Sequence, residues 1–314
     1  MAIQIPAISR RRFLGTSLAA GAGALFTANS PRFSAAEETD RSPDCWAMIS
    51  DTHIPGDRNQ ILNEVNPVNN LIAIRQDILA CPKKPHGAIV SGDCVFLHGL
   101  ASDYPTLLEE FQPLRDGGMS LHFVMGNHDD RGNFLNALAN HEKQAERPRI
   151  PDNFCSVLET PKVNWFFLDA LQRTNYTPGL IGKTQLNWLA RELDRRPNKP
   201  ALLVAHHNPR FDMPQDKQWE GHLKDTDELW EIILPRKQVK GYVYGHSHHW
   251  GCGTKDDVHL INIPATAWKF NAAEPTAWVL AELKNEGIAL TPRCLDPNHP
   301  AHDKTVELAW RKSA

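Results

Sequence analysis

The sequence lacks the motifs of several common enzyme and metal-site classes. Its six cysteines contain no Cys-x-x-Cys pair, which excludes a zinc ribbon and a thioredoxin-type redox centre. It has no Gly-x-Ser-x-Gly elbow and no Walker-type glycine-rich loop, so a serine hydrolase and a P-loop enzyme would lack essential parts. No internal repeat, low-complexity tract or linker interrupts residues 45–290. This length is sufficient for one large domain with a well-buried core.

The chain also has too little positive charge for a nucleic-acid-binding surface. Its 34 lysines and arginines are outnumbered by 37 acidic residues. Residues 1–36 carry four arginines and no acidic residue, so the formal net charge of −3 becomes −7 beyond residue 36. We therefore do not expect nucleic acid to be the main partner.

The apolar stretch near the N-terminus is too short for a membrane span. Residues 13–28 are rich in Gly, Ala and Leu, but a spanning helix needs roughly 20 apolar residues. The preceding segment, Ser9-Arg10-Arg11-Arg12-Phe13-Leu14, matches the twin-arginine export pattern at every specified position. Residues 1–36 are thus expected to be a signal peptide, cleaved before Glu37 or near Asn29-Ser30, with an uncleaved membrane anchor as the alternative.

This signal predicts that the protein is folded before the twin-arginine machinery exports it and becomes periplasmic or secreted. We expect no stable membrane span after processing.

Export permits disulfides, but the spacing of the cysteines does not select a pairing. Cys45 and Cys94 lie in or beside expected core strands, where a buried free thiol is the favoured state. The remaining cysteines are Cys81, Cys155, Cys252 and Cys294.

Five short apolar runs each lead to residues of types that bind metal ions. Buried parallel strands are typically continuous apolar runs, and open α/β sheets bind ligands just past the carboxyl ends of such strands. The pattern therefore predicts a metal site along one edge of a sheet. The runs are 46–49, 87–90, 121–125, 201–205 and 241–244, and they lead to Asp51 and His53, to Asp93, to Asn127 and His128, to His206, and to His246 and His248, respectively.

Helical apolar periodicity lies between these runs and indicates βαβ units with helices on the outer faces. Short strands dominate residues 157–170 and 258–290, so we expect a second sheet packed against the first. The predicted fold is α/β, a four-layer α/β/β/α sandwich of two mixed sheets flanked by helices. The helical faces comprise Leu107, Leu108, Phe111 and Leu114; Phe134, Leu135 and Leu138; Leu186, Leu189, Ala190 and Leu193; and Leu229, Trp230, Ile232 and Ile233.

We expect a short N-terminal segment at 37–44, one domain at 45–295 and a solvated C-terminal extension at 296–314. The histidines of that extension, His299 and His302, are assigned no ligand role.

The chemistry of the strand-end residues suits two adjacent divalent ions. Such ions need hard oxygen ligands, imidazoles and a carboxylate able to bridge them. Asp51 and His53 are two residues apart and can face the same ion, and Gly92 allows backbone and metal to approach closely at Asp93. Asn127 offers a neutral oxygen, which limits the negative charge of a site that must admit phosphate. Any one of these residues could instead be a cap or a turn residue, but that explanation would have to apply seven times.

In order and spacing, the blocks resemble the signature of the calcineurin-like metallophosphoesterases: Asp-x-His, Gly-Asp, Gly-Asn-His-Asp/Glu, a strand-end His and Gly-His-x-His. The similarity covers roughly residues 45–292. The family usually has His-His-Pro or His-Tyr-Pro where this chain has His206-His207-Asn208-Pro209, so His207 is the alternative to His206. The resemblance implies two divalent ions (Mn, Fe, Zn or similar). It assigns Asp51, His53, Asp93 and His248 to the first ion, and Asp93 as the bridge, Asn127, His206 and His246 to the second.

One branch of the family is the most similar. Gly126 to Arg131 resembles the Gly-Asn-His-Asp-Asp-Arg/Lys of class III cyclic nucleotide phosphodiesterases and glycerophosphodiesterases, as do Phe167-Leu168-Asp169 and the stretch from Gly182 to Leu189. After the Gly-Asp block the chain reads Cys94-Val95-Phe96, without the metal-binding tyrosine of purple acid phosphatases, so a charge-transfer iron site is not expected.

Two features near the site each allow two interpretations from the sequence. Arg131 could reach a phosphate substituent of the substrate, or pair with Asp129 or Asp130 and only shape the loop. The segment from Pro209 to Asp225, which contains Arg210, Trp219 and His222, is expected to form the lip of the site, with an ordinary surface loop as the alternative.

The resemblance implies an enzyme that hydrolyses phosphodiester bonds, with phosphomonoester bonds as a second class, in a small-molecule substrate. The metals would lower the pKa of water, and the resulting hydroxide would attack phosphorus, with His128 and Asp93 as the catalytic residues. A nucleotidase or a protein phosphatase on the same scaffold is the alternative. So is a non-catalytic metal-binding scaffold protein, which would be expected to have lost ligands or His128, and this chain has lost none.

Overall fold

The computed structural model describes residues 3–5, 41–141, 153–211 and 221–312, and these residues form two sheets packed face to face. In the seven-stranded sheet the order is β1 (Ile3–Ile5), β4 (Ser120–Phe123), β3 (Lys84–Val90), β2 (Arg41–Ile49), β11 (Ala277–Lys284), β12 (Gly287–Cys294) and β13 (Val306–Ala309). In the six-stranded sheet it is β5 (Ser156–Glu159), β6 (Asn164–Phe167), β7 (Ala201–Val204), β8 (Val239–Tyr244), β10 (Val258–Asn262) and β9 (Gly251–Lys255).

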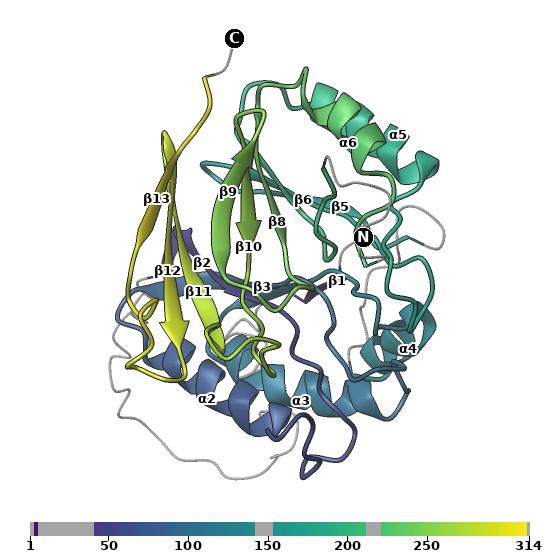
Figure 1. Ribbon diagram of the computed structural model, residues 1–314, viewed down its shortest axis with the longest axis vertical. Helices are drawn as coiled ribbons and strands as arrows, with labels where there is room; N and C mark the ends of the chain where they lie inside the picture. Colours follow the sequence, from purple (N-terminus) through teal and green to yellow (C-terminus); the bar gives the residue numbers. More distant parts are fainter. Residues whose placement is uncertain (1–2, 6–40, 142–152, 212–220, 313–314) are drawn as a thin grey trace, which may run out of the picture.

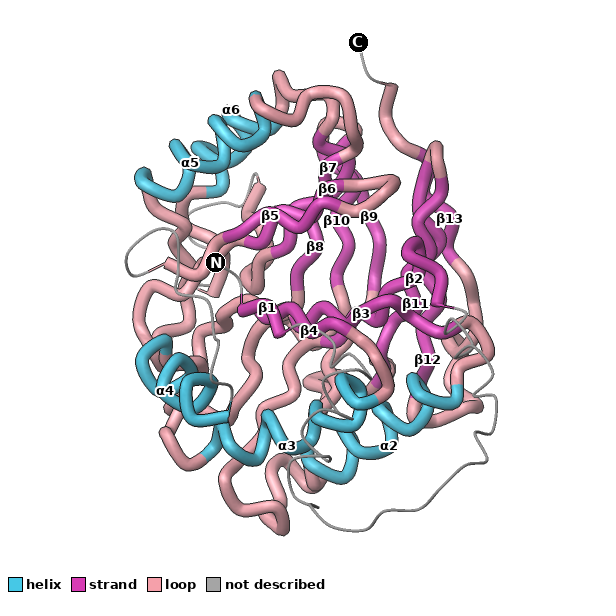
Figure 2. Tube along the Cα trace, turned by 180° about the vertical axis from the view of Figure 1, so that it is seen from behind, coloured by secondary structure: helices cyan, strands magenta, loops and turns pink. Residues whose placement is uncertain are grey.

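Helices cover the outer face of each sheet, as Figures 1 and 2 show. On the first sheet lie α2 (Pro67–Ala80), α3 (Asp103–Asp116) and α4 (Arg131–His141). On the second lie α5 (Lys183–Asp194) and α6 (Thr226–Ile233). The predicted four-layer α/β/β/α sandwich is therefore confirmed, and the predicted helical faces fall in α3 to α6.

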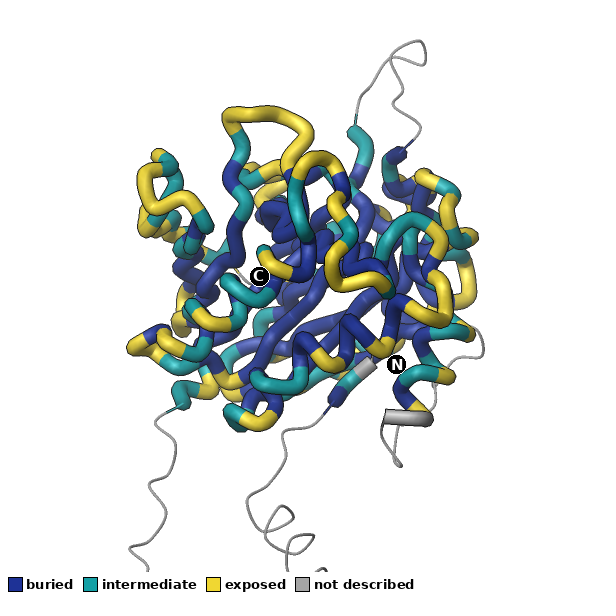
Figure 3. Tube along the Cα trace, turned by 90° about the horizontal axis from the view of Figure 1, so that it is seen from below, coloured by how far each residue is buried: buried dark blue, intermediate teal, exposed yellow. Residues whose placement is uncertain are grey.

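Three hydrophobic clusters fill the spaces between the layers. One joins the first sheet to its helices and another joins the second sheet to α5 and α6. The third lies between the sheets, where the rings of Trp46 and Trp165 lie 6.0 Å apart. Buried residues form the interior of the molecule, while exposed residues concentrate in its outer loops (Figure 3). Burial of this apolar surface is the main term that stabilises the fold.

The strands that precede the predicted site residues run parallel within each sheet. β2 pairs parallel with β3, and β3 with β4. In the second sheet β7 pairs parallel with β8. Parallel strands present their carboxyl ends at the same edge. The loops after β2, β3, β4, β7 and β8 therefore meet, as the five apolar runs predict.

The C-terminal segment differs from its prediction. Val306–Ala309 forms β13, which pairs antiparallel with β12 from Gly287↔Ala309 to Leu290↔Val306. The expectation of a solvated extension was therefore wrong for this part of 296–314. Alternate residues of β13 are half-buried, because only one face of this edge strand packs on the domain. No ligand group forms around His299 or His302 within the described residues.

The N-terminus adds a strand where a signal peptide was expected. Ile3–Ile5 pairs antiparallel with β4, and the side chain of Ile5 is buried in the core between the first sheet and its helices. The twin-arginine segment 9–14 and the proposed cleavage sites lie outside the described residues, so the signal peptide stays a prediction. Within the part of the chain that is described, no helix has the length and apolar character to cross a membrane.

The helix α2 was not predicted from the sequence. Its start is nevertheless encoded locally, because the Asn66 side chain accepts a hydrogen bond from the Asn69 backbone N–H at 2.9 Å and Pro67 occupies the first turn.

All six cysteines are free thiols, and Cys45 and Cys94 are buried as predicted.

Candidate metal centre

The loops that carry the predicted site residues adopt a backbone conformation that side chains rarely take. Asp51, His53, Asp93, His246 and His248 have φ values of 52°, 44°, 47°, 67° and 49°. Non-glycine residues with left-handed φ cost energy and cluster at functional sites, where the surrounding structure holds them in place. Each of these loops therefore turns its polar side chain back toward the same point at the sheet edge.

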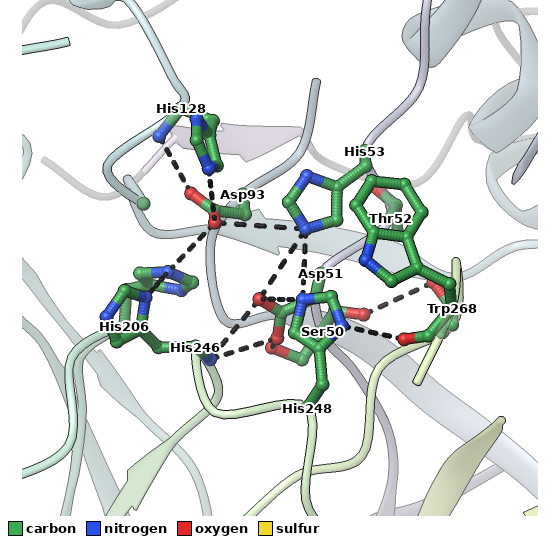
Figure 4. A network of polar contacts seen from close by, with 12 residues as sticks. Ser50, Asp51, Thr52, His53, Asp93, His128, His206, His246, His248 and Trp268 are labelled. Carbon is green, nitrogen blue, oxygen red and sulfur yellow. Dashed lines mark hydrogen bonds and ion pairs between the residues drawn. The ribbon is translucent and has the colours of Figure 1, made fainter. Parts of the chain in front are cut away.

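Asp51, His53 and His248 form the first group of ligand atoms (Figure 4). The Nε2 atoms of His53 and His248 lie 3.1 Å apart. His248 Nε2 is 3.4 Å from Asp51 Oδ1, and His53 Nε2 is 3.9 Å from the same oxygen. All three residues are buried. This convergence of nitrogen and oxygen lone pairs suits a divalent cation.

Asp93, His206 and His246 form the second group, and a further set, His53, Asp93 and His128, overlaps with both, so Asp93 lies between the first group and the second. Asp93 Oδ2 is 3.3 Å from His206 Nε2 in the second group and 3.9 Å from His53 Nε2 in the first. His206 Nε2 lies 3.2 Å from His246 Nδ1. The Asp93 carboxylate therefore lies within 4 Å of a histidine of each group, and its role as a bridge between two ions stays a prediction.

Carbonyl groups orient two of the imidazoles. His248 Nδ1 lies 2.6 Å from the Trp268 carbonyl oxygen, and His206 Nδ1 lies 2.8 Å from that of Ser91. A carbonyl only accepts, so in both rings Nδ1 carries the hydrogen. The Nε2 atoms then point into the site, and such supporting contacts are typical of metal-binding histidines.

Asn127 offers an oxygen that the rest of the described structure does not satisfy. The residue is buried, and its Oδ1 has no hydrogen-bond partner among the described residues. Its backbone carbonyl accepts from the Asn175 N–H at 2.6 Å, so the loop is held. An unpaired buried carbonyl costs about 1–3 kcal/mol, which a cation would offset. The residues present therefore fit a pair of divalent ions.

Burial and close contacts shift the pKa values of the convergent groups. Burial lowers the pKa of His53 and of His246 to about 3, so both rings are neutral at pH 7. Burial alone would raise the pKa of Asp51, but the adjacent His248 outweighs it and the value falls to about 2. Burial would lower the pKa of His206, but Asp93 reverses the effect and raises it to about 9. A cation entering this group would displace the proton of His206.

His206, and not His207, faces the Asp93 carboxylate. The His207 ring turns away, with Nε2 3.0 Å from the Thr177 carbonyl oxygen. Burial holds the pKa of His207 well below its usual range. A Cβ at Gly92 would lie 2.6 Å from His206 Nδ1, so glycine at that position lets the His206 ring lie directly against the Asp93 loop.

His128 is the most open of the predicted site residues. Its side chain is 22% exposed, whereas that of Asp93 is 3% exposed. Its backbone N–H donates to Asp93 Oδ1 at 2.8 Å, and its ring Nδ1 lies 2.8 Å from the Leu97 carbonyl oxygen. Nε2 is therefore the free end of the ring, 3.9 Å from Asp93 Oδ2 and on the solvent-facing side of the site.

Arg131 pairs with a residue that neither alternative named. Its Nε donates to Asp169 Oδ2 at 2.7 Å, and its terminal nitrogen donates to Asp169 Oδ1 at 2.8 Å. The alternative in which Arg131 has a structural role therefore agrees with the contacts, but the partners it named, Asp129 and Asp130, were wrong. Asp169 is fully buried. Its backbone N–H donates to Gln185 Oε1, and its backbone carbonyl accepts from Gln185 Nε2. Arg131, Asp169 and Gln185 therefore form one hydrogen-bonded structural unit.

Asp129 has a structural role that sequence reasoning missed. Its carboxylate accepts from the backbone N–H groups of Gly126 at 2.8 Å, Cys94 at 3.1 Å and Val95 at 3.3 Å. It joins the loop after β4 to the loop after β3. Burial, reinforced by Asp93, raises its pKa to about 7.

Trp268 was also missed, because an aromatic residue in a loop carries no specific sequence signal. Its ring stacks on His53 with centroids 4.3 Å apart (Figure 4).

The expected lip of the site is described only at its ends, since residues 212–220, including Trp219, lie outside the described part. There the Arg210 N–H donates to Thr226 Oγ1, and His222 contacts the Asn208 side chain.

Comparisons with known proteins identify related sequences and a related fold. The family model for calcineurin-like phosphoesterases matches residues 47–250. A 3',5'-cyclic-nucleotide phosphodiesterase from Nostoc sp. is 24% identical over 251 residues, 78% of this chain and 86% of that protein. An Arcobacter nitrofigilis protein named "Probable glycerophosphodiester phosphodiesterase" is 23% identical over 77% of this chain and 82% of its own length. A solved dimetal phosphatase from Danio rerio has the same fold, with a TM-score of 0.62 and 14% identity over 85% of this chain and 99% of its own.

Gly126→Ala should displace Asp93 and reduce metal binding, because the added Cβ would lie 2.1 Å from the Asp93 backbone nitrogen and Oδ1. We expect activity to fall by roughly 100-fold or more, as displacements of about 1 Å do in active sites. Gly253→Ala is the matched control, since a Cβ there meets nothing within 4 Å. Metal analysis and activity, with circular dichroism as the folding check, test this. A folded Gly126→Ala variant with normal metal content and rate would contradict the geometry.

Proposed function

The chain belongs to the calcineurin-like phosphoesterase family, and from that premise we propose that this metal-dependent hydrolase cleaves small-molecule phosphodiesters in preference to phosphomonoesters. The observation that carries the proposal is the placement of Asp93 between two groups of convergent histidines. The family uses two divalent metals, and the relatives named as phosphodiesterases match over most of the chain.

Each group of ligand atoms would hold one ion. We assign Asp51, His53, His248 and Asp93 to the first, and Asp93, Asn127, His206 and His246 to the second. When bound, such ions lower the pKa of water and stabilise negative charge on phosphoryl oxygens. The chain's own contribution is to fix the imidazole orientations through the Trp268 and Ser91 carbonyls and to keep Asp51, His53, Asp93, His206, His246 and His248 buried, whereas His128 is partly exposed.

His128 and Asp93 are the proposed catalytic pair. The Asp93 carboxylate accepts the His128 backbone N–H, and the Leu97 carbonyl accepts from ring Nδ1, so the imidazole is fixed in place. Nε2 then faces the open side of the site, where it would donate a proton to the leaving oxygen. A positioned acid of this kind contributes roughly 10²–10⁴-fold to rate.

The preference for diesters is supported by the relatives and not by Arg131. The guanidinium of Arg131 is held by Asp169 within the fold, which removes the argument that it contacts substrate. The rival functions are a nucleotidase or protein phosphatase on this scaffold and a non-catalytic scaffold protein. The convergence of intact ligand atoms favours an enzyme over the last of these.

A substrate panel with the Mn²⁺- or Fe²⁺-loaded protein tests the proposal. Bis-p-nitrophenyl phosphate, cyclic AMP and glycerophosphodiesters should be hydrolysed with higher kcat/KM than p-nitrophenyl phosphate, because we propose a site for disubstituted phosphate. The metal-free protein, prepared with a chelator, is the control and should be inactive. Much faster turnover of p-nitrophenyl phosphate than of its bis ester would contradict the diester preference.

Substitutions should separate the metal-binding role from the proton-donor role. Asp93→Ala should lose both metal and activity, because it removes the carboxylate that lies between His53 of the first group and His206 of the second. His128→Ala should keep its metal and lose roughly 10²–10⁴-fold in rate. His249→Ala, an exposed imidazole bonded to Glu274, is the control and should change little. Loss of metal from His128→Ala to the extent seen in Asp93→Ala would show that His128 is a ligand.

We further propose export through the twin-arginine route, with the folded protein acting in the periplasm or outside the cell. The support is the Ser9–Leu14 sequence and the long span from Asp51 to His248, which favours assembly of the site before translocation. Replacing Arg10 and Arg11 together by Lys should leave the precursor in the cytoplasm, detected by fractionation and immunoblotting. Continued export of this variant would indicate another route.

A further inference from the structure

Phe270 is exposed beside the metal centre. Three large hydrophobic side chains are exposed among the described residues, and Phe270, at 70%, is the most exposed, compared with 62% for Ile61 and 54% for Leu100. One face of its ring is nevertheless occupied. It stacks on His248 with centroids 4.1 Å apart and an interplanar angle of 17°. An aromatic side chain therefore stands at the edge of the site with its second face open.

The segment that carries this ring is held against the Asp51 loop. The Thr266 N–H donates to the Ser50 carbonyl at 3.0 Å, and the Ala267 N–H donates to that of Asp51 at 3.1 Å. Next to them, Trp268 stacks on His53 and its carbonyl contacts His248 Nδ1. Residues 266–268 thus form a fixed wall of the metal centre, and Phe270 lies at its outer end.

The wall is apolar at Ala267 and Trp268, whereas the rim beside His128 is polar. Trp268 packs with Leu62 and Ala267, and Phe96 contacts this cluster. On the other rim, the Asn175 side chain contacts His98 Nδ1 at 3.2 Å. A substrate phosphate at the metals would therefore meet an apolar surface on one side and polar groups on the other. An open aromatic face on a fixed wall suits a flat ring that stacks on it.

We propose that the open face of Phe270 binds the nucleobase of a nucleotide-type phosphodiester, so that Phe270 is a specificity-determining residue. This inference rests on the proposed function and narrows its substrate class. His248 Nε2 lies among the first group of ligand atoms, and the face of the His248 ring stacks on Phe270. The open face of Phe270 is therefore separated from the metal centre by the thickness of the Phe270 and His248 rings. A ribose spans a comparable distance between its phosphate and its base. Glycerol-type diesters lack the ring and would gain nothing from Phe270.

A purely supporting role for Phe270 gives a different expectation. If the ring only shields His248, its loss would weaken every phosphate ligand alike, because the change would act through the metal. Stacking predicts a loss confined to ligands that carry a base. Base–aromatic stacking corresponds to a factor of roughly 5–100 in affinity.

Adenosine 5'-monophosphate and ribose 5-phosphate form a matched pair of probes, since ribose 5-phosphate has a hydroxyl group where the nucleotide carries its base. Their affinities for the Mn²⁺-loaded protein can be measured by calorimetry and as inhibition of bis-p-nitrophenyl phosphate hydrolysis. The wild-type protein should bind the adenosine ligand more tightly. Phe270→Ala should weaken it by roughly 5–100-fold and leave ribose 5-phosphate within about twofold.

Two further variants test the role of the aromatic face. Phe270→Leu keeps an apolar side chain over His248 and should lose the base dependence like Phe270→Ala, whereas Phe270→Trp should restore it. Leu100→Ala is the control at another exposed hydrophobic residue and should change neither affinity.

Equal weakening of both ligands, no change in Phe270→Ala, or no preference for the base in the wild-type protein would each overturn the proposal. Because calorimetry needs no turnover, the outcome is separate from the diester preference, which the substrate panel decides.

Discussion

The convergence of buried imidazoles and carboxylates on Asp93 is the interaction on which the rest of the structure depends. Nitrogen atoms of His53 and His248 lie 3.1 Å apart, those of His206 and His246 lie 3.2 Å apart, and Asp93 lies between the pairs. Grouping so many ligand atoms without water is expensive unless a cation binds their lone pairs. The left-handed backbone at Asp51, His53, Asp93, His246 and His248 adds to that cost. The fold tolerates both because the site is built for divalent ions.

The sandwich serves this constraint by bringing distant loops into contact. Parallel strands place their carboxyl ends at one edge, and the two stacked sheets bring the loops after β2, β3 and β4 against those after β7 and β8. Glycines permit the close approach, since a Cβ at Gly126 or Gly245 would lie about 2 Å from atoms of the neighbouring loop. Asp129 then joins two of the loops through three backbone N–H groups. The geometry is therefore set mainly by contacts between loops.

Much of the fold and of the site could be predicted, because strand ends and metal-binding residue types are local signals. The five apolar runs became strands, and the residues that follow them converge as expected. Contacts between distant segments gave no such signal. Arg131 pairs with Asp169, which lies 38 positions away in the sequence. Residues 306–309 form a strand by pairing with the edge of β12. Trp268 and Phe270 resemble ordinary apolar residues in the sequence, since only the folded structure places them on the rings of His53 and His248.

The central claim is that Asp93 bridges two divalent ions, and the most direct test is a crystal structure of the Mn²⁺-reconstituted protein with anomalous scattering recorded at the manganese edge. The account predicts two peaks roughly 3.5–4 Å apart, one on each side of Asp93, together with close to two equivalents of metal in solution. The first peak should contact Asp51, His53 and His248, and the second should contact Asn127, His206 and His246. A single peak, or a pair that does not share Asp93, would contradict it.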